Sequence, residues 1–194
     1  MYQKGNHGYQ NIPRKERQSF LLIDGQPTTE VDFTTLHPCI FLNREGRECP
    51  KDMYSEVLKQ LGIRKSKKRR AAIKNVILSA LNMNTVHGIY TFTGQQESYQ
   101  GNLKDHCKPI DIYNAIITLY PELKQYLGDG DNSDRLQAAD SIIMIDILER
   151  LAKMGIVGLP LHDSVICKVP HKAIVEREMK AVYEAYMGFD IHVK

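Results

Sequence analysis

Residues 154–170 constrain the fold of this chain more than any other stretch. They contain an apolar run, 154–159, and a second β-rich run, 164–169. The polar residues His162 and Asp163 lie between these runs, which is the pattern of a β-hairpin. We therefore expect Asp163 at the tip of a hairpin, directed out of a sheet. A carboxylate presented in this way is half of a site that holds a divalent metal through oxygen ligands.

A second carboxylate, Asp32, stands at the end of another strand-like run. The runs 20–23 and 28–33 flank the turn-type cluster 24–27, which predicts a second hairpin. Because Asp32 and Asp163 each end or turn a strand, they can converge in one sheet. Two convergent carboxylates with cations nearby are what metal-assisted phosphoryl transfer requires. Strand-end aspartates are also often simply solvated, so the pattern alone leaves both interpretations open.

The rest of the sequence is mostly helical in pattern. Helices are expected at 34–41, 52–61, 64–82, 110–119, 134–154 and 171–187, with a loop at 83–107 that includes a possible strand at 89–92, and an edge strand at 189–193. The helix at 134–154 is expected to be buried on nearly all sides against the sheet. This order predicts an α+β fold, with an antiparallel sheet packed by helices on one face and a helical lobe inserted early.

Three parts follow from this order. Residues 1–18 are expected to form a polar N-terminal arm with little core of its own. Residues 19–45 and 132–194 would form the domain that contains the sheet, and 46–131 the helical insertion.

The expected helix at 64–82 carries the densest positive charge of the protein in its N-terminal half. Arg70 and Lys74 lie one helical turn apart on it. Such a run is most simply a solvated helix face, and the formal net charge of +3 indicates no particular partner. The stacking of Arg70 and Lys74 favours binding of nucleic acid or a triphosphate.

The four cysteines lie far apart and form no C-x-x-C pair. Neither a zinc ribbon nor a dense disulfide framework is indicated, so a reducing compartment is expected. Cys49, His106 and Cys107 fit no standard metal-site spacing. No run of apolar residues is long enough to span a membrane. We expect a cytoplasmic protein without a membrane partner.

Three segments resemble motifs of family A DNA polymerases and of single-subunit phage-type polymerases. Residues 31–38 (VDFTTLHP) resemble motif A, 70–74 resemble the Arg-x-x-x-Lys of motif B, and 161–164 (LHDS) resemble motif C. Residues 52–54 and 136–140 agree with the same families. The chain also looks like polymerase-like proteins encoded by phages and plasmids.

The resemblance covers roughly residues 19–82 and 134–193. It implies that the sheet domain is a polymerase palm and that the insertion is a reduced, fingers-like lobe. The implied function is two-metal, template-directed nucleotidyl transfer, DNA polymerase-like but with an uncertain product sugar. The form would be minimal or fragmentary, without a thumb or an exonuclease.

The resemblance also implies a catalytic site. Asp32 and Asp163 would be the catalytic carboxylates and would bind two Mg²⁺ ions, for which Mn²⁺ could substitute. The backbone carbonyl of Phe33 would be a further ligand. Arg70 and Lys74 would bind the triphosphate. Arginine can donate two hydrogen bonds to one phosphate, and lysine offers a single point charge.

The remaining implied positions concern the sugar, the base and the primer. They are His37, Leu78 and Asn82 at the sugar and base pocket, and His162, Ser164 and Gln137 at the primer or template. His37 stands where the DNA enzymes have a sugar-selecting Glu, and Asn82 stands where the family usually has Tyr. The product sugar is therefore not predicted.

Two functions of different class stay open. The first is the nucleotidyltransferase, with primer-template nucleic acid, nucleoside triphosphates and a protein that supplies a thumb or processivity function as partners. The second is a non-catalytic polymerase-like module for nucleic-acid binding or assembly. The presence of both carboxylates and both cations favours the first. The missing thumb, and Asn82-Met83 in place of the Tyr-Gly that the family usually has after motif B, favour the second. A two-metal nuclease or phosphohydrolase is a more distant third.

Overall fold

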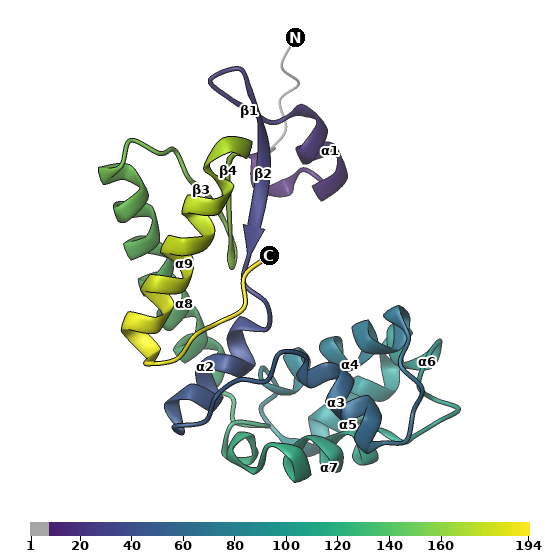
Figure 1. Cartoon of the computed structure of the whole chain (residues 1–194). Coiled ribbons are helices and arrows are strands. Elements are labelled where there is room, and N and C mark those ends of the chain that lie inside the picture. Colours follow the sequence, from purple (N-terminus) through teal and green to yellow (C-terminus); the bar gives the residue numbers. More distant parts are fainter. Residues whose placement is uncertain (1–7) are drawn as a thin grey trace. The chain divides into compact units, whose positions relative to one another are not determined.

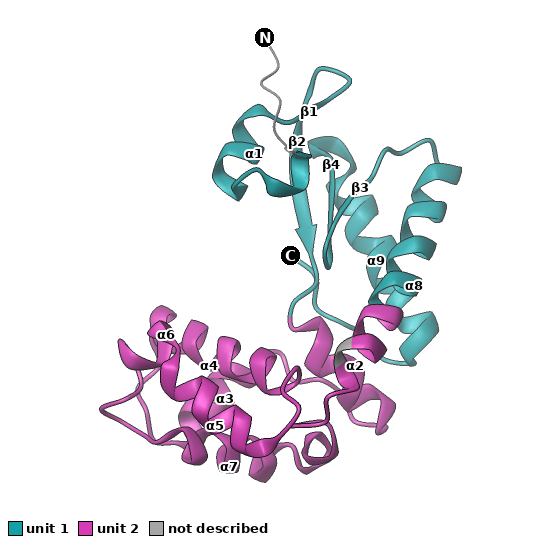
Figure 2. Cartoon of the chain, turned by 180° about the vertical axis from the view of Figure 1, so that it is seen from behind, with its two compact units in different colours: residues 1–34, 140–194 teal, residues 35–139 magenta. Residues whose placement is uncertain are grey.

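The computed structural model describes residues 8–194, with the exception of the side chain of Ser133. The chain divides into two compact units (Figure 2). Residues 1–34 and 140–194 form what we call the sheet unit, and residues 35–139 form the helical unit. The division thus falls at 34 and 139, whereas the sequence pattern suggested 45 and 131.

The sheet unit contains four strands in the order β1-β2-β4-β3 (Figure 1). They are β1 (Leu22–Ile23), β2 (Gln26–Asp32), β3 (Leu159–Leu161) and β4 (Ser164–Lys168). All three pairings are antiparallel. The α+β class with an antiparallel sheet is therefore confirmed. In the β1–β2 hairpin the strands lie close to the runs that the local pattern predicts. In the other hairpin β3 begins only at Leu159, so the expected strand at 154–159 is wrong over residues 154–158.

The expected edge strand at 189–193 is wrong as a full strand. Pairing there is limited to an isolated bridge between Phe33 and Val193. It is flanked by a hydrogen bond from the Thr34 N–H to the His192 carbonyl at 2.8 Å and by reciprocal backbone bonds between Asp32 and Lys194 at 3.0 and 3.1 Å. The α-helix before it, α9 (Lys172–Met187), ends at Gly188 in the left-handed conformation. The carboxylate of Asp190 then accepts a hydrogen bond from the backbone N–H of Ile191, at 2.9 Å. This local bond competes with a sheet ladder, as short polar side chains commonly do.

Helices α8 (Asn132–Lys153) and α9 lie to one side of the strands, and α1 (Arg14–Phe20) lies to the other (Figures 1 and 2). A short η3 (Val169–His171) links β4 to α9. Gly158, just before β3, lets α8 approach β4. A Cβ at this position would meet Leu151 Cδ1 and Val165 Cγ1 at 3.1 Å.

The expectation that α8 is buried on nearly all sides is wrong. Ile143, Ile147 and Leu151 face the core, but Ile142 and Ile145 are 51% and 57% exposed. The buried residues recur at a spacing of four, so one stripe of the helix meets the core. Apolar residue type alone did not reveal which face that stripe occupies.

Residues 8–18 belong to the expected N-terminal arm, and some of their side chains contact the sheet. Residues 1–7 of that arm lie outside the described part of the chain. Arg17 is buried and pairs with Glu30 of β2 at 2.9 Å. Tyr9, in η1 (Tyr9–Asn11), donates its hydroxyl to the Pro160 carbonyl at 2.7 Å. Among residues 8–18 only Arg17 is buried, so the described part of the expected arm adds little to the core, and a distant partner compensates the burial of Arg17.

The helical unit contains all of the elements between β2 and α8. They are α2 (Leu36–Arg44), α3 (Met53–Gln60), α4 (Lys67–Ala80), α5 (Val86–Gln95), α6 (Glu97–Gln100), α7 (Pro109–Leu119) and η2 (Pro121–Gln125). Its core includes the fully buried side chains Phe41, Tyr54, Leu58, Ile73, Ile77 and Leu81.

The expected loop and strand within 83–107 are wrong, because α5 and α6 form there. Thr85 caps α5 by accepting a hydrogen bond from the backbone N–H of Gly88, at 3.0 Å. Ile89 and Thr93, one turn apart, are the buried residues of α5. Packing of this face outweighs the strand propensity of the β-branched and aromatic residues.

Cys39 and Cys49 form a disulfide, with a Cα–Cα distance of 5.1 Å. This bond runs against the expected reducing compartment, and the sequence spacing gave no sign of it. Cys107 and Cys167 are free thiols. Over the part of the chain that the structure describes, every helix is too short or too polar to cross a membrane.

Candidate functional site

Asp32 and Asp163 leave the same end of the sheet from adjacent strands. Asp32 is the last residue of β2 and pairs with Ser164, the residue that follows Asp163. The backbone N–H of Phe33 donates to the Asp163 carbonyl at 3.2 Å. Adjacent strands are about 4.8 Å apart. The register of β2 and β4 therefore brings the two aspartates together through main-chain contacts.

Both aspartates lie close to a residue with left-handed backbone. His162, which shares the two-residue β3–β4 turn with Asp163, has φ +51°, and Thr35, just beyond Asp32, has φ +65°. Such angles are uncommon outside glycine, and unusual for a β-branched residue. Backbone conformations of this kind concentrate at functional sites, where surrounding structure maintains them. Asp24, in the β1–β2 turn, has φ +49°, so among the described residues this conformation is not confined to the end of the sheet that carries Asp32 and Asp163.

Asp140 is a further carboxylate close to Asp163 and His162, and the sequence motifs did not assign it a role. Its Oδ1 is buried and has no hydrogen-bond partner. Burial, and then the negative charge of Asp163, raise the pKa of Asp140 to about 6, while the charge of His162 lowers it. Asp140 therefore lies near the hairpin tip. An acidic residue in the apolar half of α8 was the available signal.

The site has few positive charges of its own. Lys194 Nζ lies 3.7 Å from the Asp32 carboxylate, and this lysine is 58% exposed. Hard oxygen donors and an unpaired buried carboxylate oxygen fit a divalent cation such as Mg²⁺. Among the residues described, no three His, Cys, Asp or Glu side chains converge as a ready-made metal group. Mg²⁺ commonly keeps several waters and uses only one or two carboxylates, so the pair suits it.

Phe33 has the orientation that its expected role needs. Its ring is buried and lies 5.9 Å from the ring of Tyr183. Its N–H points to the Asp163 carbonyl. In an extended chain the N–H and C=O of one residue point to the same side. The Phe33 carbonyl therefore faces the hairpin tip as well.

The two residues next to Asp163 differ in exposure. Ser164 is only 2% exposed, and its hydroxyl donates to the Leu161 carbonyl at 2.9 Å. Ser164 thus closes the hairpin, instead of presenting its hydroxyl to a primer. His162 is exposed and can contact one.

The expected triphosphate residues belong to the helical unit and differ from one another. The Arg70 guanidinium donates through Nε to Asp52 at 2.9 Å and lies 5.0 Å from the Tyr54 ring centroid. Partial burial would raise the pKa of Asp52, but bonds from Ser55 and Lys65 and the charge of Arg70 lower it overall. Asp52 is therefore ionised and already engages Arg70.

Lys74 is exposed one turn further along α4. Leu78 follows on the same stripe and lines a cavity of about 520 Å³, which is also lined by Phe92 of α5. Asn82 donates its side-chain amide to the Leu78 carbonyl at 2.7 Å. The stripe predicted from motif B is thus presented on the surface of α4.

His37 and Gln137 stand apart from this stripe. His37 is half-buried in the first turn of α2, and Gln137 is exposed on α8. The structure therefore groups Asp32, Asp163 and Asp140 in the sheet unit. It groups Lys74 and Leu78 on α4 of the helical unit, with Asn82 just beyond the C-terminus of that helix.

Comparison of the chain with protein-family models and with curated proteins finds no match.

Proposed function

We propose that this protein is a metal-dependent, template-directed nucleotidyltransferase of the DNA polymerase-like kind. The observation that carries the proposal is the carboxylate group at the end of β2 and the tip of the β3–β4 hairpin. Asp32 and Asp163 are adjacent through strand register, and Asp140 adds a buried oxygen without a hydrogen-bond partner. The resemblance of the surrounding residues to motifs A and C supports the same class.

In this proposal Asp32, Asp163 and the Phe33 carbonyl hold two Mg²⁺ ions, for which Mn²⁺ can substitute. When bound, such ions lower the pKa of an attacking hydroxyl and neutralise charge on the leaving group. Asp140 increases the negative field that attracts the cations. Ser164 positions the hairpin, because its hydroxyl ties the turn to Leu161.

Arg70 and Lys74 would bind the triphosphate. Lys74 is exposed and offers a point charge. Arg70 uses Nε for Asp52, so its terminal nitrogens are the ones proposed to donate to phosphate. Leu78, Asn82 and His37 would contact the sugar and base, while His162 and Gln137 would contact primer or template.

The test is extension of a labelled primer on a template with Mg²⁺ and nucleoside triphosphates. Asp163→Asn keeps the shape but removes the charge, so extension should fall by at least about a hundredfold. Asp24→Asn is the matched control, because Asp24 is a 72% exposed turn aspartate of the same unit. Extension by neither wild type nor control, or equal extension by all three proteins, would sink the proposal.

A non-catalytic nucleic-acid-binding module is the second candidate. The engagement of Arg70 by Asp52 and the burial of Ser164 favour it, because both reduce the groups available to substrates. Nucleic-acid binding that neither needs metal nor leads to extension would support this candidate.

The proposed activity carries two further expectations. A separate protein would supply the thumb or processivity function, and the protein would act in the cytoplasm, where nucleoside triphosphates are made. The disulfide between Cys39 and Cys49 would be reduced in that compartment. Thiol labelling after rapid acid quenching of cells distinguishes the reduced from the oxidised pair.

A further inference from the structure

A surface seam runs along the helical unit between α4 and residues 92–106. Three side-chain contacts cross it, namely Arg69 Nη2 to His106 Nε2 at 2.6 Å, Asn75 Nδ2 to Ser98 Oγ at 3.3 Å, and Gln96 Nε2 to Ser79 Oγ at 2.9 Å. From one contact to the next, the residue number rises on α4 and falls on the segment 92–106, so the two segments run antiparallel. With a rise of 1.5 Å per helical residue, these contacts span about 15 Å.

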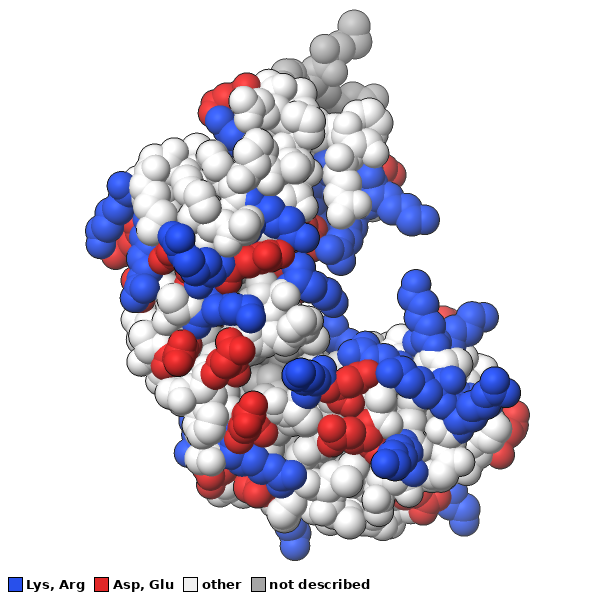
Figure 3. All heavy atoms as spheres, viewed as in Figure 1, with Lys and Arg blue, Asp and Glu red and all other residues white. Residues whose placement is uncertain are grey.

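One end of the seam opens into a strongly basic groove of about 600 Å³. Its cationic lining is Arg64, Lys65, Lys68 and Arg69, and Asp105 is the acidic residue among the lining residues described. Figure 3 shows Lys and Arg side chains gathered over this part of the helical unit. The N-terminus of α4, a helix of 14 residues, contributes further positive potential to the same groove.

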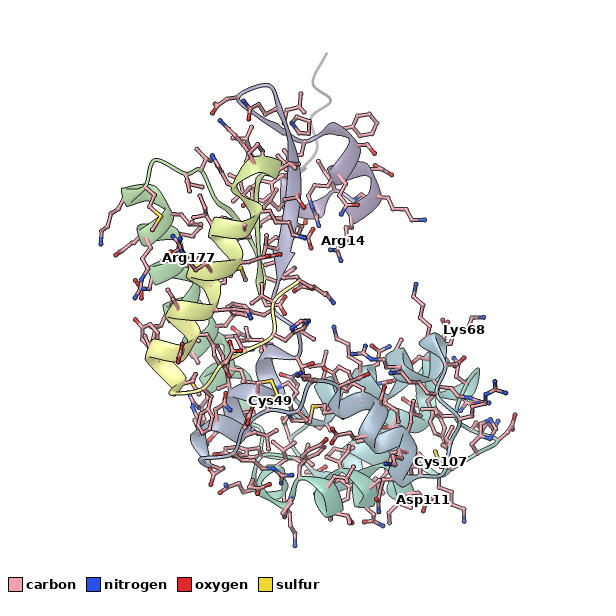
Figure 4. The ribbon with its side chains drawn as sticks, in the orientation of Figure 1. Arg14, Cys49, Lys68, Cys107, Asp111 and Arg177 are labelled. Carbon is pink, nitrogen blue, oxygen red and sulfur yellow. A yellow bond between two sulfur atoms is a disulfide. The ribbon has the colours of Figure 1, made fainter. Side chains whose placement is uncertain are left out.

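The cations of this groove are largely left for an external anion. Lys65 pairs with Asp52 at 3.0 Å. Arg69 instead donates to two neutral acceptors, the Arg64 carbonyl and His106 Nε2, so it is held in place without losing its charge. Lys68 takes part in none of the ion pairs found among the described residues, and its side chain extends away from the ribbon (Figure 4).

The other end of the seam offers an apolar ring surface beside amides. Phe92 is 41% exposed and lines the cavity of about 520 Å³ together with Asn75 and Gln96. Exposed aromatic rings stack nucleobases, and amide side chains bond base edges that are not paired. A phosphate-binding groove followed by a stacking surface matches a single strand. In a duplex the bases are already paired and stacked, so they cannot reach Phe92.

We propose that this seam binds single-stranded nucleic acid, with the backbone phosphates at Arg64, Lys68 and Arg69 and a base on Phe92. The surface does not include Arg70 and Lys74, the positions assigned to the triphosphate, but its cavity at Phe92 is also lined by Leu78, which is assigned above to the sugar and base. Binding here requires neither metal nor catalysis. Its failure is therefore distinguishable from failure of the proposed nucleotidyl transfer, because Asp163→Asn abolishes extension and leaves this binding intact.

The test is fluorescence anisotropy of the full chain with a labelled oligothymidylate of about ten nucleotides, in EDTA and without triphosphates. Wild type should bind with a strong salt dependence. Arg64→Gln combined with Lys68→Gln should weaken binding about tenfold or more at low salt. It should also reduce the slope of log K against log salt by about 1.4, because each lost phosphate contact is worth about 0.7 on single strands.

The matched control is Lys59→Gln combined with Lys124→Gln, which removes the same charge from lysines of the helical unit that do not line the groove. It should leave affinity nearly unchanged. Phe92→Ala should weaken binding about tenfold without changing the salt slope, because stacking releases no counterions. Circular dichroism verifies that each variant is folded. If the double variant is unfolded, Lys68→Gln alone replaces it, and the slope of log K against log salt should then change by about half as much.

Three outcomes would overturn the inference. They are no binding by wild type, equal loss in the groove variant and its control, and binding of a duplex as tight as binding of the single strand.

Discussion

The two units of this chain position their candidate residues by different means. In the sheet unit, main-chain pairing sets Asp32 beside Asp163, because strand register fixes where each residue stands. In the helical unit, the cations share one helix, and side-chain partners decide what each can bind. Arg70 is engaged by Asp52, whereas Lys74 is exposed. A sequence motif therefore predicts well where the carboxylates of the sheet unit lie. It predicts less well which cations of the helical unit can bind a substrate.

The largest expected effect concerns the stability of the sheet unit. It tests how much of that stability comes from the buried side-chain pair Arg17–Glu30 and not from main-chain pairing. Glu30→Ala would leave Arg17 buried without its partner, so the free energy of unfolding should fall by about 3–5 kcal/mol. Urea denaturation measures this change. Arg14→Ala is the control, since Arg14 is 52% exposed and 3.7 Å from Glu30, and it should cost less than about 1 kcal/mol. Equal losses in both variants would show that the buried pair has no special weight.

The next effect concerns the helical unit. Reduction of Cys39–Cys49, which are ten positions apart, should lower its free energy of unfolding by about 2–3 kcal/mol through the entropy of the unfolded chain. Urea unfolding with and without dithiothreitol tests this, with hydrogen exchange to locate the loss in α2. Protection lost mainly from β2 and β4 would contradict the assignment of the disulfide to helical-unit stability.

A smaller effect should appear in the pH dependence of the sheet unit. The folded pKa of Asp140, about 6, lies above its ordinary value of 3.8, so folding is favoured by the protonated form. This contribution is complete below about pH 4 and is lost as the pH rises through 6. At pH 7, Asp140→Asn should therefore stabilise the protein by about 2 kcal/mol, after allowance for partial exposure.

Urea denaturation at pH 5 and pH 7 measures this effect, with Asp146→Asn as a control on the same helix. Asp146 is paired with Arg150 at 3.2 Å and should give no such gain. Asp163→Asn should also lower the pKa of Asp140, as observed by carboxyl-carbon NMR. An unchanged pKa of Asp140 in that variant would show that the charge of Asp163 does not act on Asp140.

The smallest effect concerns the backbone at the hairpin tip. His162→Gly relieves the left-handed conformation of a non-glycine residue, which should raise the free energy of unfolding by about 0.5–1 kcal/mol after the entropic cost of glycine. Thermal denaturation measures it, and His192→Gly serves as a control outside the turn. A clear loss of stability in His162→Gly would mean that the imidazole stabilises the fold by more than the left-handed backbone destabilises it.

Local patterns predicted the elements whose signals are local. The two hairpins, and the helices near 53–60, 67–80, 109–119 and 172–187, follow from alternation, periodicity and their end signals. The strand-like composition of 89–92 misled, because burial of Ile89 and Thr93 is a tertiary effect. For the same reason the sequence did not show that Ile142 and Ile145 face outward.

The candidate site divides in the same way. Asp32 and Asp163 could be predicted because each ends or turns a recognisable strand. Asp140 could not be given a role, because its raised pKa depends on burial and on a charge brought near by folding. The pairing of Arg70 with Asp52 likewise depends on the packing of α3 against α4, which residue spacing does not show.

The central claim is that Asp32 and Asp163 hold divalent metal together. Anomalous X-ray scattering from crystals soaked in Mn²⁺ tests it most directly, with Asp163→Asn crystals treated identically. A manganese peak in contact with both carboxylates is expected in the wild type, and its loss is expected in the variant. A wild-type site without manganese under saturating metal, or a peak that persists unchanged in Asp163→Asn, would contradict it.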